Sequence, residues 1–490
     1  MAINFVVQIL IVRYLSKGEY GAFAYAMSLV SLGSSLAVFG MDKTVTRFLP
    51  IYQERGEYQK LLGSLIMVLG TVASLGFFLV LLVFALQGWI AESFVLDTSD
   101  VRLLLLLIIL SPVQALDSIL VGMLAVFAKP SAIFFRRHVL GPGLKLLVVL
   151  MLLLWGGDVY LLSAGYLAAA VLGLTLYSGI LLRDLRKQVI WEHLRMRNIK
   201  FPIKEIFSFS LPLLTTNLVY VLRSQLVVVI IQYFHTTVDV AAYRAVQPVA
   251  DLNTTVIQSF TLLFMPAMAR MFARKDQQGM HNLYWQNAIW ITMISLPIFL
   301  STFALAEPLT IALFGQRYAD SAWIMAWLAL GYYFNAALGF NADTLRIHGR
   351  LRYTLTIDFV AMLVSLGLNF LLIPRYGALG AAIGTCGTLV IYNILNHIGL
   401  RSATTINLFE WRYLKVYVSI ILATVGLTLL QSSVSLPIYV GIPIVGLISL
   451  IVLLFNRDVL DIEQTFPELS RIQFIRFLFA LRRHNKPLAE

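Results

Sequence analysis

The chain has 490 residues, of which 59% are hydrophobic and only 13% are charged. A soluble domain carries roughly 25% charged residues, so this composition excludes a soluble protein and indicates an integral membrane protein. The formal net charge of +12 is explained by basic cytoplasmic loops that face anionic lipid, and nucleic acid is not expected as a partner.

Other classes of protein are excluded by missing motifs. The single cysteine, Cys386, rules out an internal disulfide framework. The seven histidines are scattered without metal-binding spacing, so no metal site is expected. A phosphate-binding Gly-x-x-x-x-Gly-Lys-Ser/Thr loop is missing as well, so the chain itself does not look like an ATP-driven pump.

The hydrophobic stretches predict an all-α integral membrane protein with about fourteen transmembrane helices. A helix needs about 20 apolar residues to cross the hydrocarbon core of a bilayer. The predicted spans lie near residues 1–15, 21–41, 61–86, 101–127, 139–155, 159–182, 206–232, 240–265, 285–305, 321–345, 354–373, 376–399, 412–430 and 437–455.

Lys and Arg residues gather on alternate loops, which the positive-inside rule places in the cytoplasm. The opposite loops are short, and they carry acids such as Asp97, Asp158 and Asp239. This alternation holds along the whole chain. It predicts a multi-pass protein with both termini in the cytoplasm.

An internal repeat relates the two halves of the chain. The stretch that begins Glu19-Tyr20-Gly21 aligns with the stretch that begins at Asp239, and each opens a span that closes on a proline, Pro50 or Pro266. Such duplication is how many transporters are built. It predicts two pseudo-symmetric six-helix lobes at 1–182 and 206–400, a basic cytoplasmic linker at 183–205, two extra C-terminal helices within 401–455 and a cytoplasmic tail at 456–490.

The first predicted helix is shorter than its counterpart in the second lobe. Only Met1 to Val12 precede its turn, which is too few residues to cross a bilayer. We expect that this helix lacks its cytoplasmic half; the alternative is a re-entrant half-helix.

The stretch from Arg13 to Pro50 carries a family resemblance. It reads Arg13-Tyr14-Leu15 with Glu19-Tyr20-Gly21, then an apolar helix, then Gly40-Met41-Asp42 with Arg47-Phe48-Leu49-Pro50. This order resembles the opening of the polysaccharide flippases, which are O-antigen and exopolysaccharide translocases. Because that family shares a superfamily with drug exporters and lipid-linked precursor flippases, the motif specifies the fold better than the cargo.

The resemblance implies a function. It implies a flippase of the bacterial inner membrane that moves an undecaprenyl-diphosphate-linked oligosaccharide from the cytoplasmic to the outer leaflet, for surface polysaccharide such as lipopolysaccharide. The lobes would rock in alternating access around a central cavity. The expected partners are the lipid-linked oligosaccharide, membrane lipids and other polysaccharide-assembly proteins.

Charged residues inside spans are costly unless they face a cavity or a partner, so they are the first candidates for a binding site. Arg223 and Asp251 lie deep in the seventh and eighth spans, with Asn217 and Gln225 near Arg223. They are interpreted as a cationic site for a diphosphate or acidic sugar. The alternative is an ion pair that only fastens two helices.

The first lobe and the predicted cytoplasmic mouth offer further candidates. Asp117 and Lys145 can line the same cavity, although Lys145 can also snorkel toward the inner interface. The predicted mouth or gate residues are Arg47, Asp42, Asp343, Arg346 and Asp358; the alternatives are folding or ordinary interfacial roles. Arg47 is carried over from the family resemblance.

No catalytic residue and no cofactor are predicted. Coupling to an H⁺ or Na⁺ gradient through Asp117 and Asp251 is a hypothesis. Two rivals keep the fold, a drug or cation antiporter and a peptidoglycan-precursor flippase. A third rival, a membrane polysaccharide polymerase or ligase, is disfavoured because the outside loops are short.

Overall fold

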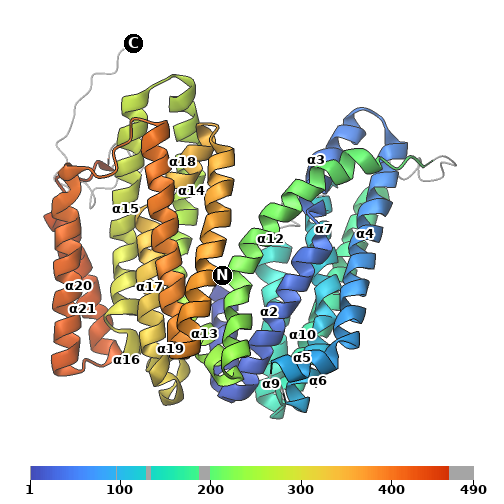
Figure 1. Cartoon of the computed structure of the whole chain (residues 1–490), viewed down its shortest axis with the longest axis horizontal. Coiled ribbons are helices and arrows are strands. Elements are labelled where there is room, and N and C mark those ends of the chain that lie inside the picture. Colours follow the sequence, from blue (N-terminus) through green and yellow to red (C-terminus); the bar gives the residue numbers. More distant parts are fainter. Residues whose placement is uncertain (1, 95–96, 128–133, 187–198, 463–490) are drawn as a thin grey trace. The chain divides into compact units, whose positions relative to one another are not determined.

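The computed structural model describes residues 2–94, 97–127, 134–186 and 199–462 (Figure 1). These residues are almost entirely helical, and no strand occurs among them. Eleven helices in this part of the chain are long and apolar enough to cross a membrane, and two shorter apolar helices accompany them at Ile3–Tyr14 and Gly141–Trp155. The predicted class of an all-α membrane protein is therefore confirmed, while the number fourteen stays a prediction.

The same order of elements recurs in the two halves of the chain. The first half runs through α1 (Ala2–Tyr14), α2 (Lys17–Val38), α3 (Met41–Glu54), α4 (Tyr58–Ala85), α5 (Gln87–Ser93), α6 (Thr98–Ile108), α7 (Leu110–Phe127), the π-helical turn η1 (Arg136–Leu140), α9 (Gly141–Trp155) and α10 (Val159–Arg186). The second half runs through α12 (Ile203–Phe234), α13 (Thr237–Ala250), α14 (Leu252–Ala273), α15 (Gln277–Phe303), α16 (Ala306–Phe314), η2 (Gln316–Ser321), α17 (Ala322–Ala337), α18 (Asn341–Ile347) and α19 (Leu351–Ala403). The turn η3 (Trp411–Tyr413), α20 (Leu414–Val434) and α21 (Ile438–Phe455) follow.

Interrupted helices mark this repeat. The broken pair α2–α3 corresponds in order to α13–α14, and the pair α6–α7 corresponds to α17–α18. The turn between α9 and α10 corresponds to a break inside α19 at Gly377, where φ is +56°. Each half therefore builds its spans from the same sequence of straight and interrupted helices.

Two compact units result from the packing. The first comprises residues up to Ala245 together with Asn369–Ala381, and the second comprises Val246–Leu368 together with the residues from Ala382 onward. Each unit is described by itself below. The lobe boundaries at 182 and 206 stay a prediction, and most of the predicted linker and tail, residues 187–198 and 463–490, lies outside the described residues.

The break between α2 and α3 has a steric cause. Phe39 and Gly40 both adopt left-handed φ values, +52° and +70°. A Cβ atom on Gly40 would lie 2.6 Å from the carbonyl oxygen of Ser210 in α12. Glycine therefore allows both the backbone conformation and the close approach of α12, which packs against α2 and α3 (Figure 1).

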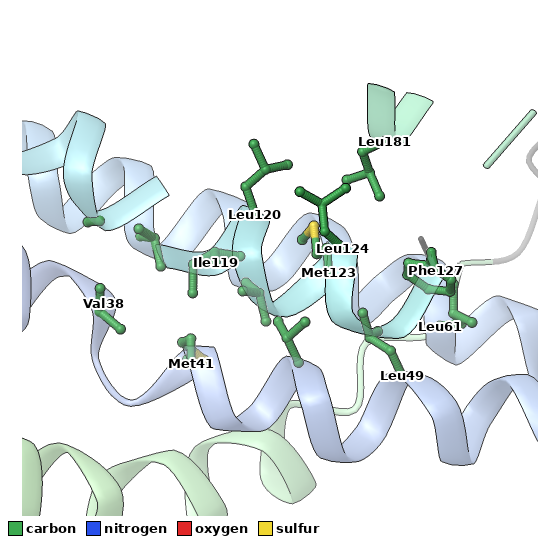
Figure 2. Packing of buried hydrophobic residues seen from close by; sticks show 14 of the residues in the cluster. Val38, Met41, Leu49, Leu61, Ile119, Leu120, Met123, Leu124, Phe127 and Leu181 are labelled. Atoms are coloured by element: carbon green, nitrogen blue, oxygen red, sulfur yellow. The ribbon is translucent and has the colours of Figure 1, made fainter. Parts of the chain in front are cut away.

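The core of the first unit forms around α7, which packs against α3, α4 and α10. Figure 2 shows Ile119, Met123 and Phe127 of α7 near Met41 and Leu49 of α3. Lipid tails are as apolar as these side chains, so van der Waals packing rather than exclusion of water holds such helices together. This core fixes the position of α7, which carries Asp117.

The core of the second unit forms around α15, which packs against α14, α17 and α21. Gln286 of α15 is buried and donates hydrogen bonds to Tyr413 Oη at 2.9 Å and to the carbonyl oxygen of Val459 at 3.1 Å. Its side-chain oxygen accepts a bond from the amide of Asp461 at 3.2 Å. These contacts fasten the residues after α21 to the centre of the unit.

Candidate functional site

Arg244 is the centre of a polar network inside the first unit. It lies seven residues after the start of α13, so its Cα is about 10 Å along the helix axis. Its Nη2 donates to Ser28 Oγ of α2 at 2.9 Å and to Gln225 Oε1 of α12. Arg244 therefore lies about two helical turns inside the candidate membrane span Thr237–Ala273.

A fourth helix completes the network. Gln8 of α1 donates to Tyr20 Oη of α2 at 2.5 Å and to the carbonyl oxygen of Arg244 at 3.4 Å. Nearby, α2 approaches the start of α13 so closely that a Cβ atom on Gly21 would lie 1.7 Å from the carbonyl oxygen of Thr237. Helices from both halves of the chain therefore hold the Arg244 side chain in place.

Arg244 is absent from the residues predicted from the sequence, although it lies in the predicted span 240–265. The rule that selected Arg223 and Asp251, a charge inside a span, applies to Arg244 equally well. Gln225 was predicted as a cavity residue, and the structure places it directly against this guanidinium.

The remaining residues predicted with Arg223 are found on two units. Asn217 and Arg223 are half-buried on α12 of the first unit. Asp251 is exposed at the junction of α13 and α14 in the second unit, where it accepts a hydrogen bond from Thr254 Oγ1 at 2.5 Å. The predicted pairing of Arg223 with Asp251 therefore stays a prediction.

Asp117 of α7 forms an ion pair with Arg136, the first residue of η1. Arg136 lies between the predicted spans 101–127 and 139–155, yet its side chain is only 9% exposed. The Cζ atom of Arg136 lies 4.7 Å from the ring centroid of Tyr177 in α10. Lys145 of α9 lies elsewhere, with Nζ 5.5 Å from the ring centroid of Tyr166.

The predicted mouth residues on α3 are arranged differently from those on α18 and α19. Asp42 lies 3.8 Å from Lys43, whereas the guanidinium of Arg47 lies 4.4 Å from the ring centroid of Phe209. Arg47 is therefore held by an aromatic ring of α12.

Arg346 joins the two acids predicted with it. Its Nη1 lies 3.0 Å from Asp343 Oδ1 and its Nη2 lies 3.9 Å from Asp358 Oδ2. The structure thus brings Asp343, Arg346 and Asp358 together across α18 and α19. Their role as a gate stays a prediction.

In the described part of the chain, no group of three or more His, Cys, Asp or Glu side chains could hold a metal ion.

Comparison with known proteins places this arrangement in a family. Residues 10–323 match the family described as "Polysaccharide biosynthesis protein". An uncharacterized membrane protein of Methanocaldococcus jannaschii is 22% identical over 78% of this chain and 77% of its own length. The "Probable low-salt glycan biosynthesis flippase Agl15" of Haloferax volcanii is 21% identical over 80% of this chain and 79% of its own.

Solved structures share the fold. "Lipid II flippase MurJ, inward closed conformation" superimposes with a TM-score of 0.69 at 14% identity, covering 94% of this chain and 97% of MurJ. An inward-facing multidrug resistance MATE transporter superimposes with a TM-score of 0.65 at 13% identity, covering 82% and 93%. The architecture is thus the two-lobe transporter fold of these proteins, and the match over residues 10–323 establishes that the chain belongs to the polysaccharide biosynthesis protein family.

Proposed function

We propose that the protein is a flippase that moves an oligosaccharide, linked to undecaprenyl diphosphate, from the cytoplasmic to the outer leaflet of a bacterial inner membrane. The family and the flippase name of the Haloferax volcanii relative support this function. The observation that carries it is Arg244, a cation inside a candidate membrane span that hydroxyl and amide oxygens hold in a fixed orientation.

The chemistry of such a cargo requires a cation at this depth. A diphosphate cannot enter hydrocarbon unaided, because the cost of removing water from its charges is not compensated there. A guanidinium binds phosphate oxygens through two parallel hydrogen bonds. Ser28 and Gln225 hold the guanidinium of Arg244 through neutral oxygens. We therefore assign Arg244 as a binding residue for the diphosphate. Further cations are Arg223 in the candidate span Ile203–Phe234 and Lys145 in the shorter apolar helix Gly141–Trp155.

The lobes would alternate access to the two leaflets while the lipid tail stays in the bilayer. This process breaks no covalent bond, so it needs no catalytic residue. We propose that both termini are cytoplasmic, that polysaccharide-assembly proteins are partners, and that an H⁺ or Na⁺ gradient drives the cycle through Asp117 and Asp251. Transport that persists when both acids are neutralised would remove the coupling proposal.

The function is tested in cells that lack their own polysaccharide flippase. We expect the wild-type chain to restore surface glycan, and Arg244→Gln to reduce export roughly tenfold or more, because hydrogen bonds to charged groups are worth about 1.5–3 kcal/mol each. Arg244→Lys keeps the charge but loses the planar fork, so its export should be intermediate. Arg352→Gln, which changes an exposed cation at the start of α19, is the matched control.

The membrane level of each variant is measured in the same cells. Failure of the wild type in several glycan backgrounds would overturn the cargo assignment and favour a drug, cation or peptidoglycan-precursor substrate. If wild type and Arg244→Gln restore glycan equally, Arg244 is a structural residue.

A further inference from the structure

We propose that Arg136 is a second anion-binding residue, and that the carboxylate of Asp117 occupies it as an internal substitute until the diphosphate of the substrate takes its place. This inference rests on the proposed function, because it assumes an anionic lipid-linked cargo. It assigns a defined role to an ion pair that loop and span patterns alone do not predict.

The guanidinium of Arg136 is held by Tyr177 and by Asp117. Its Cζ lies over the ring of Tyr177, 4.7 Å from the centroid. Its edge meets the Asp117 carboxylate, and Nη1 and Nη2 also lie 3.5 Å and 3.4 Å from the carbonyl oxygen of Asp117. A guanidinium oriented in this way presents a fork of N–H groups to oxygen acceptors, which is the arrangement that binds phosphate.

The two members of the pair differ in exposure. The Asp117 side chain is 42% exposed, whereas that of Arg136 is 9% exposed. The acid can therefore turn away without unpacking the core, while the base stays where it is. Because an uncompensated buried charge is strongly unfavourable, the acid is expected to leave only when another anion arrives.

Tyr177 supplies an independent observation. Its side chain is 2% exposed, and its hydroxyl has no hydrogen-bond partner among the described residues. A buried hydroxyl without a partner is rare and disfavoured. An oxyanion bound at Arg136 would bring acceptor oxygens beside this ring, and the hydroxyl is then able to donate to one of them.

The location also suits a site within the transport path. Asp117 lies ten residues before the end of α7 at Phe127, which places it about 15 Å along the axis from that end. Arg136 opens a π-helical turn, a conformation that is rare and found frequently at functional sites. The first residue of this turn pairs with Asp117, which lies inside the candidate membrane span Thr98–Phe127.

Binding of a short polyprenyl diphosphate to purified protein in lipid nanodiscs tests the proposal. The probe is geranyl diphosphate, and geraniol and inorganic pyrophosphate separate the contribution of the lipid from that of the free anion. We expect Asp117→Asn to tighten binding of geranyl diphosphate roughly tenfold, because the competing carboxylate is gone. We expect Arg136→Gln to weaken it roughly tenfold, and the control Arg352→Gln to leave it unchanged.

A merely structural ion pair gives a different pattern. Asp117→Asn and Arg136→Gln would then weaken binding equally, and Asp117→Arg combined with Arg136→Asp would restore it, which overturns the proposal. If Arg136→Gln does not fold, Asp117→Asn decides alone: unchanged or weaker binding overturns the proposal.

The export assay keeps this inference separate from the proposed function. A wild-type protein that restores surface glycan and prefers geranyl diphosphate to geraniol, while Arg136→Gln binds geranyl diphosphate as tightly as wild type, would contradict only the role of Arg136. A wild-type protein that neither restores glycan nor binds the diphosphate would overturn the flippase assignment as well.

Discussion

Two arginine–carboxylate groups of the same chemistry lie in very different surroundings. In the first unit, Arg136 pairs with Asp117 and stacks on Tyr177, with 9% of its side chain exposed. In the second unit, Arg346 lies between two acids, Asp343 at 3.0 Å and Asp358 at 3.9 Å, with 45% of its side chain exposed. The first base is enclosed by packing, and the second is open.

This difference in burial determines what each group can do. A buried guanidinium depends on its counter-ion, and removing Asp117 would leave the charge of Arg136 uncompensated. An exposed guanidinium can break its ion pairs with acids at little cost in free energy, because water and salt ions solvate the separated charges. The buried pair therefore suits the exchange of one anion for another, whereas the open group suits a contact that forms and breaks as helices move.

The largest effect is expected at the buried pair. Arg136→Ala should lower the free energy of unfolding by about 3 kcal/mol, because it leaves a cavity beside the buried ring of Tyr177 and removes the hydrogen bonds of the guanidinium to Asp117. Thermal or denaturant unfolding of the purified protein measures this change. A loss below about 1 kcal/mol is the range of exposed ion pairs. Such a value would contradict the difference in burial between the Arg136 group and the Arg346 group.

A steric change tests the network around Arg244 and is expected to have an intermediate effect. Gly21→Ala would place a Cβ atom 1.7 Å from the carbonyl oxygen of Thr237, so α2 and α13 must move apart. Overpacking of this kind costs about 1–3 kcal/mol. Gly18→Ala, at a position with open space, is the control, and equal stability of the two variants would contradict this close approach.

A smaller effect is expected at the open group. Arg346→Gln should lower the free energy of unfolding by at most about 1 kcal/mol. Because exposed charges are screened beyond about 3 Å at 1 M salt, the difference from wild type should shrink at that salt concentration. Unfolding measured at low and high salt checks this. A loss of unfolding free energy as large as that of Arg136→Ala would show that exposure of the arginine does not determine the stability that each group contributes.

The smallest effect is expected at an exposed pair, where Nζ of Lys415 near the start of α20 lies 3.0 Å from Oδ1 of Asp458, which follows α21. The hydrogen bond from Lys415 lowers the pKa of Asp458 below its usual value. Its stabilisation is thus present at neutral pH and is lost as pH falls through the lowered pKa. Asp458→Asn should change the melting temperature little at pH 7, and a large change would contradict an exposed pair.

Sequence patterns predicted the features that depend on local composition. Long apolar runs gave the membrane class, and the Arg13–Pro50 stretch indicated the family, which the match over residues 10–323 confirmed. Asp343 and Arg346 are neighbours on one helix, three residues apart, so their contact follows from helix geometry. Such features need no knowledge of how distant segments pack.

The features that depend on packing were not predicted. Arg136 lies outside the predicted spans, and its burial depends on the π-helical turn and on contact with Tyr177, which lies 41 residues further along the chain. The contact of Arg244 with Ser28 joins residues 216 positions apart. Sequence periodicity gives the face on which a side chain lies, but it does not give the partner that it meets.

The main proposal for this protein is that Arg244, a cation held inside a candidate membrane span, binds the diphosphate of a lipid-linked substrate as it crosses the bilayer. Its most direct test is the translocation of a fluorescent lipid-linked oligosaccharide in proteoliposomes containing wild type, Arg244→Gln or the control Arg352→Gln. We expect rapid translocation by wild type and the control. With Arg244→Gln we expect the translocation rate to fall by a factor of roughly ten or more. Equal rates for Arg244→Gln and wild type, or no translocation above empty liposomes by wild type, would contradict it.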